Sequence, residues 1–249
     1  MSASLVGSEM CIRDSSTSML AEDLKPNRLE AAKDVAAEFI NGRPNDNIGI
    51  TLFAGETFTQ CPLTVDHAVL LDMIHNIKCG LITDGTAVGM GIANAVTRLK
   101  DSKAKSKVII LLTDGTNNKG DISPMTAAEI AKSFGIRVYT IGVGTNGMAP
   151  YPYPVGNTVQ YVSMPVEIDE KTLTEIAGTT DGNYFRATSN SKLKEVYEEI
   201  DKLEKTKLNV KEYSKRDEEY HWFALAAFLC VLLEVLLRLS LIHISEPTR

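Results

Sequence analysis

The chain has 249 residues, enough for one large α/β domain or two small ones. Its net charge of −6, with no cluster of Lys and Arg among aromatic residues, argues against nucleic acid as a partner. Its 4 cysteines contain no C-x-x-C pair, so neither a zinc site nor a disulfide scaffold is indicated. A Cys61–Cys79 bridge would be feasible only in an oxidising compartment.

The two ends of the chain share an origin outside the gene. The stretch from Val6 to Ser15 can be written in codons whose reverse complement, read in another frame, encodes LSLIHISEPT near the C-terminus. That DNA resembles a transposase-end adapter used in preparing sequencing libraries. We therefore expect residues 1–15 and 239–249 to be adapter-derived and exclude them from fold reasoning. The gene's own fragment is expected to run from Ser16 to Arg238.

Patterns of helix length and strand length alternate along the first half of the chain. Residues 28–42 carry apolar residues at helical spacing and end on Gly42, a common helix stop. Residues 47–55 are apolar and β-branched, as in a strand. Two helices are predicted next, over residues 66–80 and 86–100, with Thr86 as the N-cap of the second.

The second half continues the alternation. KVIILLTDG (107–115) is a continuous apolar run, typical of a strand buried on both faces of a parallel sheet. A helix follows with Ser123 as N-cap and Pro124 at its first position. The remaining pattern predicts strand, helix, short strand and charged closing helix over residues 137–144, 169–182, 183–187 and 191–206. Such βαβ units predict an α/β fold with a doubly wound, mostly parallel sheet.

The character of the chain changes after residue 205. Residues 206–221 are polar, and we expect an extended juxtamembrane segment there. WFALAAFLCVLLEVLL then begins an almost unbroken apolar run. We interpret residues 222–238 as a truncated transmembrane helix, since a full span takes about 20 apolar residues. A buried core helix is the alternative, but the run is apolar all round and lies outside the α/β pattern.

Three loops next to the predicted strands and helices carry oxygen-bearing side chains. The first holds Asp14, Ser16 and Ser18 at alternate positions, D-G-T supplies Thr86, and T-D-G supplies Asp114 directly after VIILL. In an open α/β sheet, loops at the carboxyl ends of central strands form the ligand crevice. Hydroxyls and carboxylates without His or Cys suit Mg²⁺, with Mn²⁺ or Ca²⁺ as alternatives. Each loop alone is ordinary turn or capping chemistry. Their combination predicts a metal site.

Two enzyme interpretations compete with a binding site. GVGTNG (142–147) matches a dinucleotide fingerprint, but the prolines of MAPYPYPVGN exclude the helix that the fingerprint needs. A Mg²⁺-dependent phosphoryl-transfer or hydrolytic enzyme is the stronger rival, yet no Ser-His-Asp set or carboxylate pair stands out. Residues 146–165 are expected to form a long Pro-rich loop, either a variable surface excursion or a rim that contacts a partner.

The combination of D-S-S-T-S, D-G-T and T-D-G resembles the metal-ion-dependent adhesion site (MIDAS) of von Willebrand factor A (VWA) domains. DGTAVGMGIANAVTRLKDSKAKSKVIILLTDGTNNKGDI and the flanking segments are similar to the BatA (Bacteroides aerotolerance) family over residues 16–238. The resemblance implies that Ser16 and Ser18 bind the metal directly and Thr86 directly or through water. Asp14 and Asp114 would act mainly through water. A cation held by neutral hydroxyls keeps charge for a partner's carboxylate, so the resemblance implies binding and no catalysis.

The resemblance also implies partners and a location. The expected partners are other Bat VWA proteins, tetratricopeptide-repeat proteins and a MoxR-type ATPase. The VWA domain would span residues 16–205 on the periplasmic side of a bacterial inner membrane, although a cytoplasmic orientation stays open. The family has an apolar central strand before the metal loop. Residues 9–14 stand in for it here, with Asp14 encoded by the adapter, so we expect that strand to be lost or replaced and the fold around it weakened.

Overall fold

The computed structural model describes residues 7–79, 85–145, 147–155, 158–214, 225, 227–229 and 231–234. The chain divides into two units, residues 1–208 and residues 209–249. The first unit contains the sheet, its covering helices and a separate two-stranded hairpin. The candidate site lies within this first unit.

The main sheet has six strands in the order β3-β2-β1-β4-β5-β8. Every neighbouring pair is parallel except β2 with β3, which is antiparallel. The predicted doubly wound, mostly parallel sheet is therefore confirmed. The strands are β1 (Gly7–Asp14), β2 (Asn47–Phe53), β3 (Thr57–Thr64), β4 (Ser106–Thr113), β5 (Arg137–Val143) and β8 (Tyr184–Ala187).

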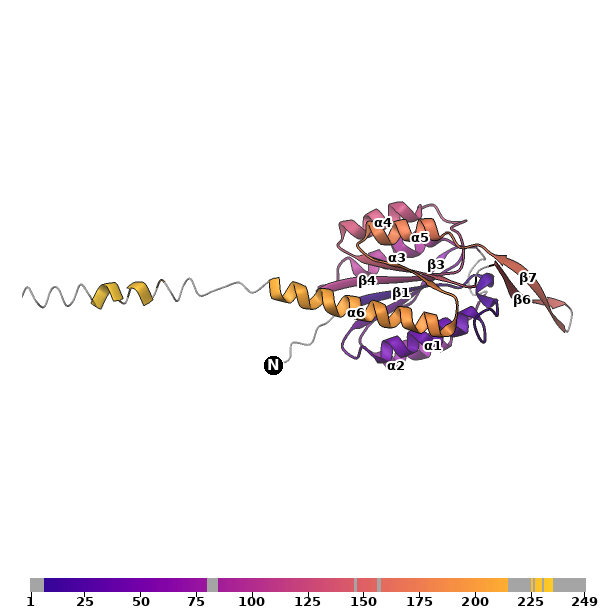
Figure 1. Ribbon diagram of the computed structural model, residues 1–249, viewed down its shortest axis with the longest axis horizontal. Coiled ribbons are helices and arrows are strands. Elements are labelled where there is room, and N and C mark those ends of the chain that lie inside the picture. The colour runs from indigo at the N-terminus through magenta and orange to yellow at the C-terminus, as the bar shows by residue number, and fades with distance from the viewer. Residues whose placement is uncertain are drawn as a thin grey trace, which may run out of the picture. The chain divides into compact units, whose positions relative to one another are not determined.

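Helices cover both faces of this sheet (Figure 1). Because β4 is buried on both sides, Ile110 joins one apolar cluster and its neighbours Ile109 and Leu111 join the other. This two-sided burial explains the continuous apolar run in the sequence. One face carries α1 (Arg28–Asn41), α2 (His67–His75) and α6 (Asn190–Ser214), and the other carries α3 (Val88–Leu99), α4 (Pro124–Ser133) and α5 (Glu170–Thr179).

Strand β1 occupies the centre of the sheet and pairs with both β2 and β4. Met10 and Ile12 fill the cluster under α3, and Cys11 fills the opposite cluster. Residues 9–14 thus do serve as the first strand. The expected weakening of the fold concerns stability and stays a prediction. Glu9 is the residue least suited to the position, because its carboxylate is buried.

Two local predictions need correction. Strand β3 is absent from the predicted elements, although T-F-T-Q-C-P-L-T alternates polar and apolar residues. Its Pro62 lacks a backbone donor, which fits the edge position that β3 takes. Helix α3 begins at Val88, and its N-cap is Ala87 rather than Thr86. The hydroxyl of Thr86 is consequently free of the predicted capping role.

The predicted loop over residues 146–165 is largely an antiparallel hairpin. Strand β6 (Gly147–Val155) pairs with β7 (Thr158–Val166) along its whole length (Figure 1). No helix opens after GVGTNG, which confirms that the fingerprint match is fortuitous. Pro150 and Pro152 alternate along β6, and the Pro150 carbonyl points away from β7 to accept a 2.9 Å hydrogen bond from the Glu22 N–H. The outer edge of β6 therefore lacks N–H donors at both prolines.

The structure also corrects the region after residue 205. Helix α6 continues to Ser214, so an extended conformation is wrong for residues 206–214, and residues 215–221 lie outside the described part. Most of the predicted transmembrane helix, residues 222–238, likewise lies outside it. Within the part of the chain that is described, no helix is both long and apolar enough to cross a bilayer. Cys61 and Cys79 are free thiols, so the bridge between them is not formed.

Candidate metal-binding site

The predicted site residues meet at the carboxyl ends of β1 and β4, the two central strands. After β1 the chain passes through α1 to β2, which lies on one side of β1 in the sheet. After β4 it passes through α4 to β5, which lies on the opposite side of the β1–β4 pair. Strand order therefore reverses between β1 and β4. Loops diverge at such a point and leave a crevice in which α/β proteins bind ligands.

Asp14, at the end of β1, is fully buried and uses both carboxylate oxygens within the protein. Oδ1 accepts a 2.9 Å hydrogen bond from the Ser16 N–H, and Oδ2 accepts a 2.8 Å bond from the Thr113 hydroxyl. The first bond closes the turn that places Ser16 after the strand, and the second ties β1 to β4. Asp14 is therefore a residue that shapes the loop.

Two serine hydroxyls and a second carboxylate lie next to this loop. The Oγ atoms of Ser16 and Ser18 are 2.8 Å apart, and the Ser18 hydroxyl donates a 2.8 Å hydrogen bond to Oδ1 of Asp114. Ser16 and Asp114 are buried, whereas Ser18 is exposed. Oxygen atoms from the segments that follow β1 and β4 thus converge, as the sequence predicts.

Thr86 reaches the same place from the loop before α3. Its N–H donates a 2.9 Å hydrogen bond to Oδ1 of Asn118, and its carbonyl accepts a 3.0 Å bond from the Asn118 N–H. A Cβ atom on Gly115 would lie 3.5 Å from the Thr86 hydroxyl, so this hydroxyl sits against the loop of Asp114. Asp84, the first residue of D-G-T, lies outside the described residues.

The electrostatics of the two carboxylates suit a cation. Burial, followed by the charge of Asp114, raises the pKa of Asp14 to about 7. Burial also raises the pKa of Asp114, against the lowering effect of Arg28. A divalent cation between the loops would favour the ionised form of both groups, because its charge offsets theirs.

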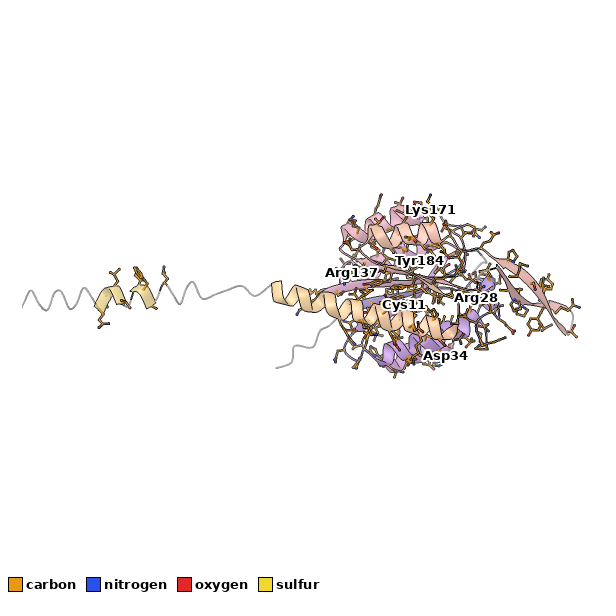
Figure 2. The ribbon with its side chains drawn as sticks, viewed as in Figure 1. Cys11, Arg28, Asp34, Arg137, Lys171 and Tyr184 are labelled. Carbon is orange, nitrogen blue, oxygen red and sulfur yellow. The ribbon has the colours of Figure 1, made fainter. Side chains whose placement is uncertain are left out.

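Arg28 is a site residue that the sequence reasoning missed. It is buried, and its Nη1 donates a 2.7 Å hydrogen bond to Oδ2 of Asp114. Nη2 and Nε bind the carboxylate of Asp23 at 2.6 and 2.7 Å. Figure 2 shows Arg28 near the root of the hairpin, far along the sheet from Arg137. No sequence pattern signals this contact, since an Arg at the first position of a helix is usually exposed.

The site opens into a cleft of about 610 Å³. One end of the cleft is polar and contains Ser18, Thr86 and Asp114, while the hairpin residues Tyr151 and Met164 line the other end. The donor set is entirely oxygen. Among the described residues, no group of three or more His, Cys, Asp or Glu side chains gathers to hold a metal. Carboxylates with hydroxyls fit a hard cation such as Mg²⁺, so the residues present fit the predicted group.

Fold and site together define a VWA domain. Residues 10–199 match the von Willebrand factor type A domain, and the chain belongs to this family. VWA domains are in general adhesion and interaction modules that carry a divalent metal at the MIDAS.

Solved structures place the chain near the aerotolerance-related proteins and confirm that resemblance. BatB from Bacteroides thetaiotaomicron has a TM-score of 0.69 and 34% identity, over 80% of this chain and 99% of that one. An aerotolerance-related membrane protein from Bacteroides fragilis has a TM-score of 0.67 and 33% identity, over 79% and 99%. Proximal thread matrix protein 1 of the mussel byssus, solved with zinc in its MIDAS motif, has 24% identity and a TM-score of 0.61, over 80% of this chain and 45% of that one, and shares the fold.

Curated relatives extend beyond the chain. An uncharacterised protein of Borreliella burgdorferi is 29% identical over 89% of this chain and 65% of its own length. A UPF0353 protein of Nocardia farcinica is 32% identical over 76% of this chain and 61% of its own length. The chain therefore spans about three fifths of the curated relatives that it matches.

Proposed function

We propose that the chain is a membrane-anchored VWA domain whose MIDAS holds Mg²⁺ and binds a carboxylate of a protein partner. Ser16 and Ser18 would hold the metal directly, and Thr86 directly or through water. Asp14 and Asp114 would act mainly by orienting those hydroxyls and bound water. The metal would supply a positively charged acceptor for the partner's acidic side chain.

The convergence of hydroxyls and carboxylates at the switch between β1 and β4 carries this proposal. Three of the five predicted ligands are neutral hydroxyls. Of the two carboxylates, Asp14 is bonded to Ser16 and Thr113, and Asp114 shares its charge with Arg28. Because these contacts partly offset the negative charge of the two carboxylates, a divalent cation in the site would keep net positive charge. That charge favours an added carboxylate from outside.

The location and partners rest on relatives. The Bacteroides fragilis neighbour is described as a membrane protein, and the apolar sequence of residues 222–238 supports an anchor in this chain too. We place the VWA domain on the periplasmic side of the inner membrane. Its proposed partners are other Bat VWA proteins, tetratricopeptide-repeat proteins and a MoxR-type ATPase.

Titration calorimetry of Mg²⁺ and Mn²⁺ into the full chain tests the site. We expect Thr86→Val and Asp114→Asn each to weaken metal binding about tenfold or more, because each removes an oxygen that holds or orients the ion. Thr116→Val is the matched control: it removes an exposed hydroxyl from the same cleft and should leave the affinity unchanged. Undiminished binding in Thr86→Val and Asp114→Asn would overturn the assignment.

The competing enzyme would need a nucleophile or a base beside the metal. The ionisable side chains lining the described cleft are Arg28, Asp114, Tyr151, Tyr153 and Glu167. Arg28 and Asp114 are bonded to one another, which leaves them unsuited to proton transfer. The geometry thus favours a binding role. Phosphatase or nucleotide turnover that is lost in Thr86→Val would instead support a Mg²⁺-dependent enzyme.

A further inference from the structure

The β6–β7 hairpin exposes more apolar surface than its structural role requires. Tyr153 is 57% exposed, Met164 49% and Val162 47%. A two-stranded ribbon gains little stability by itself, and clustered exposed apolar side chains in a soluble domain mark interaction sites. The whole stretch from Gly147 to Val166 contains no charged residue.

The register separates the two faces of this ribbon. Tyr151 lies opposite Val162, and Ala149 lies opposite Met164, so these four side chains share one face with Tyr153. Four of the five, all but Val162, line the metal-site cleft. We call this set, Ala149, Tyr151, Tyr153, Val162 and Met164, the cleft face.

The opposite face is partly tied to the domain. The Tyr161 hydroxyl donates a 3.1 Å hydrogen bond to Oε1 of Glu22, and the Pro150 carbonyl accepts from the Glu22 N–H. The hairpin root is held as well, because Asp23 accepts a 2.8 Å bond from the Thr145 N–H. The same Asp23 carboxylate binds Arg28, which binds Asp114. A chain of bonds therefore fixes the cleft face relative to the metal site.

We propose that the cleft face and the metal site form one bipartite groove for a short segment of a partner protein. The segment carries an acidic residue that reaches the metal and aromatic or apolar neighbours that pack on Tyr151, Tyr153 and Met164. This inference rests on the proposed function, because the acidic anchor needs the metal. It adds a second, metal-independent contact that selects the residues flanking the acid.

The chemistry of the groove favours a protein segment. A volume of about 610 Å³ falls within the range of ligand-binding pockets, and its polar end continues into an apolar one. Tyr and Met are enriched at protein interfaces. A membrane surface would call for Lys or Arg on the ribbon, whereas residues 147–166 contain neither and the ribbon's Tyr161 hydroxyl binds an acidic residue, Glu22. The prolines of β6 also disfavour strand addition at the outer edge of that strand, which favours binding through side-chain contact there.

A phage-displayed library of random dodecapeptides, panned on the full chain in Mg²⁺, supplies the probe. We expect enriched peptides to contain Asp or Glu beside aromatic or apolar residues and to elute with EDTA. Synthetic copies of them should bind the Tyr153→Ala/Met164→Ala variant at least tenfold more weakly. Met148→Ala/Val159→Ala is the matched control, because Met148 and Val159 are each 57% exposed and lie on the opposite face.

The readouts separate this inference from the function on which it rests. Calorimetric Mg²⁺ affinity should be unchanged in both hairpin variants, while Thr86→Val should lose metal and peptide together. Peptide binding that survives Tyr153→Ala/Met164→Ala would overturn the groove and leave the metal-dependent function standing. Enriched peptides that lack an acid or ignore EDTA would overturn both. No enrichment, equal loss in the matched control, self-association through the hairpin, or cleft-face-dependent binding to phosphatidylcholine–phosphatidylserine vesicles would each overturn the protein-segment proposal.

Discussion

Arg28 and Asp114 form a buried ion pair, with Nη1 of the arginine 2.7 Å from Oδ2 of the aspartate. The same guanidinium binds Asp23, whose carboxylate holds the Thr145 N–H at the root of the hairpin. Gly144 permits this arrangement, because its φ is +137° and a Cβ there would lie 2.8 Å from Nη2 of Arg28. The Arg28 guanidinium therefore holds both a carboxylate of the metal site, Asp114, and the carboxylate that anchors the hairpin root, Asp23.

Removing Arg28 should destabilise the domain strongly. Arg28→Ala leaves Asp23 and Asp114 buried without their shared partner, and we expect a loss of about 3–5 kcal/mol in the free energy of unfolding. Arg28→Lys should recover only part of it, since an ammonium cannot reproduce the planar, forked contacts. Urea denaturation measures both variants. A loss below about 1 kcal/mol in Arg28→Ala would show that the pair adds little.

Mg²⁺ should raise the melting temperature of the unaltered chain. A ligand that binds only the folded state at about 100 times its Kd adds about 2.7 kcal/mol. Thr86→Val should remove most of this increment, and Thr116→Val should keep it. Calorimetric melts with Mg²⁺ and with EDTA provide the comparison. Equal melting temperatures of the unaltered chain under the two conditions would contradict a metal bound to the folded domain.

Acid should weaken the contact that Glu204 of α6 makes with Arg137 and Tyr139 of β5. Burial opposes ionisation of Glu204, but hydrogen bonds from Arg137 and Tyr139 outweigh it and lower the pKa of Glu204 below its ordinary 4.5. A lowered folded-state pKa contributes stability above the unfolded pKa, and this contribution is lost as pH falls through the folded value. The contribution should therefore be complete above pH 4.5 and fade below it.

Glu204→Gln isolates this effect from the other carboxylates. Near neutral pH the variant should be about 3–5 kcal/mol less stable, because Arg137 loses a buried partner. The difference between the two chains should shrink as the pH falls below 4.5. Urea denaturation at successive pH values measures it. A difference that stays constant down to acid pH would mean that Glu204 does not titrate as inferred.

The buried pair of Glu9 and Arg43 should respond asymmetrically to substitution. Arg43 also binds Asp201 at 2.8 Å and Asp46 at 3.2 Å, so Glu9→Val leaves it paired. Arg43→Ala instead leaves the Glu9 carboxylate buried alone and should cost about 3–5 kcal/mol. We expect Glu9→Val to be neutral or stabilising, since an apolar residue suits the centre of a sheet. Similar losses in the two variants would contradict this.

The same position bears on the weakening predicted for the first strand. If residues 1–15 are adapter-derived, Glu9 occupies a central strand without having been selected for it. We expect a broadened melt of the unaltered chain that Glu9→Val sharpens. A sharp, cooperative melt of the unaltered chain would show that Met10, Cys11 and Ile12 are an adequate core strand by themselves.

Sequence patterns predicted the parts of this fold whose cause is local. The VIILL run identified β4 because two-sided burial leaves no polar alternation, and Ser123 with Pro124 marked the start of α4 through capping geometry. The hairpin was missed because alternating prolines are typical of loops, although an edge without donors tolerates them. The prediction of Thr86 as an N-cap was wrong for a similar reason. A Thr before a helix can either cap the helix or turn its hydroxyl elsewhere.

The site was predictable only in part for a related reason. Asp14 ends β1, and Ser16 and Ser18 follow it. Asp114 follows β4, and the topology of a parallel sheet brings the ends of these two strands together. Thr86 comes instead from the loop before α3, which the sequence marks by D-G-T. Arg28 contacts Asp114 across 86 positions of the sequence from a helix face that no periodicity marks as buried. Side-chain pairing of that kind depends on how α1 is placed over the sheet, which local sequence does not encode.

The alternation of Pro150 and Pro152 has a consequence for crowded surroundings. Neighbouring copies of an exposed ribbon can join edge to edge into growing sheets when N–H groups on one edge meet carbonyls on another. Along β6 the prolines remove those donors while leaving the side chains of the cleft face on display. The β6 edge can thus present these side chains to a partner without itself serving as a template for strands of neighbouring copies.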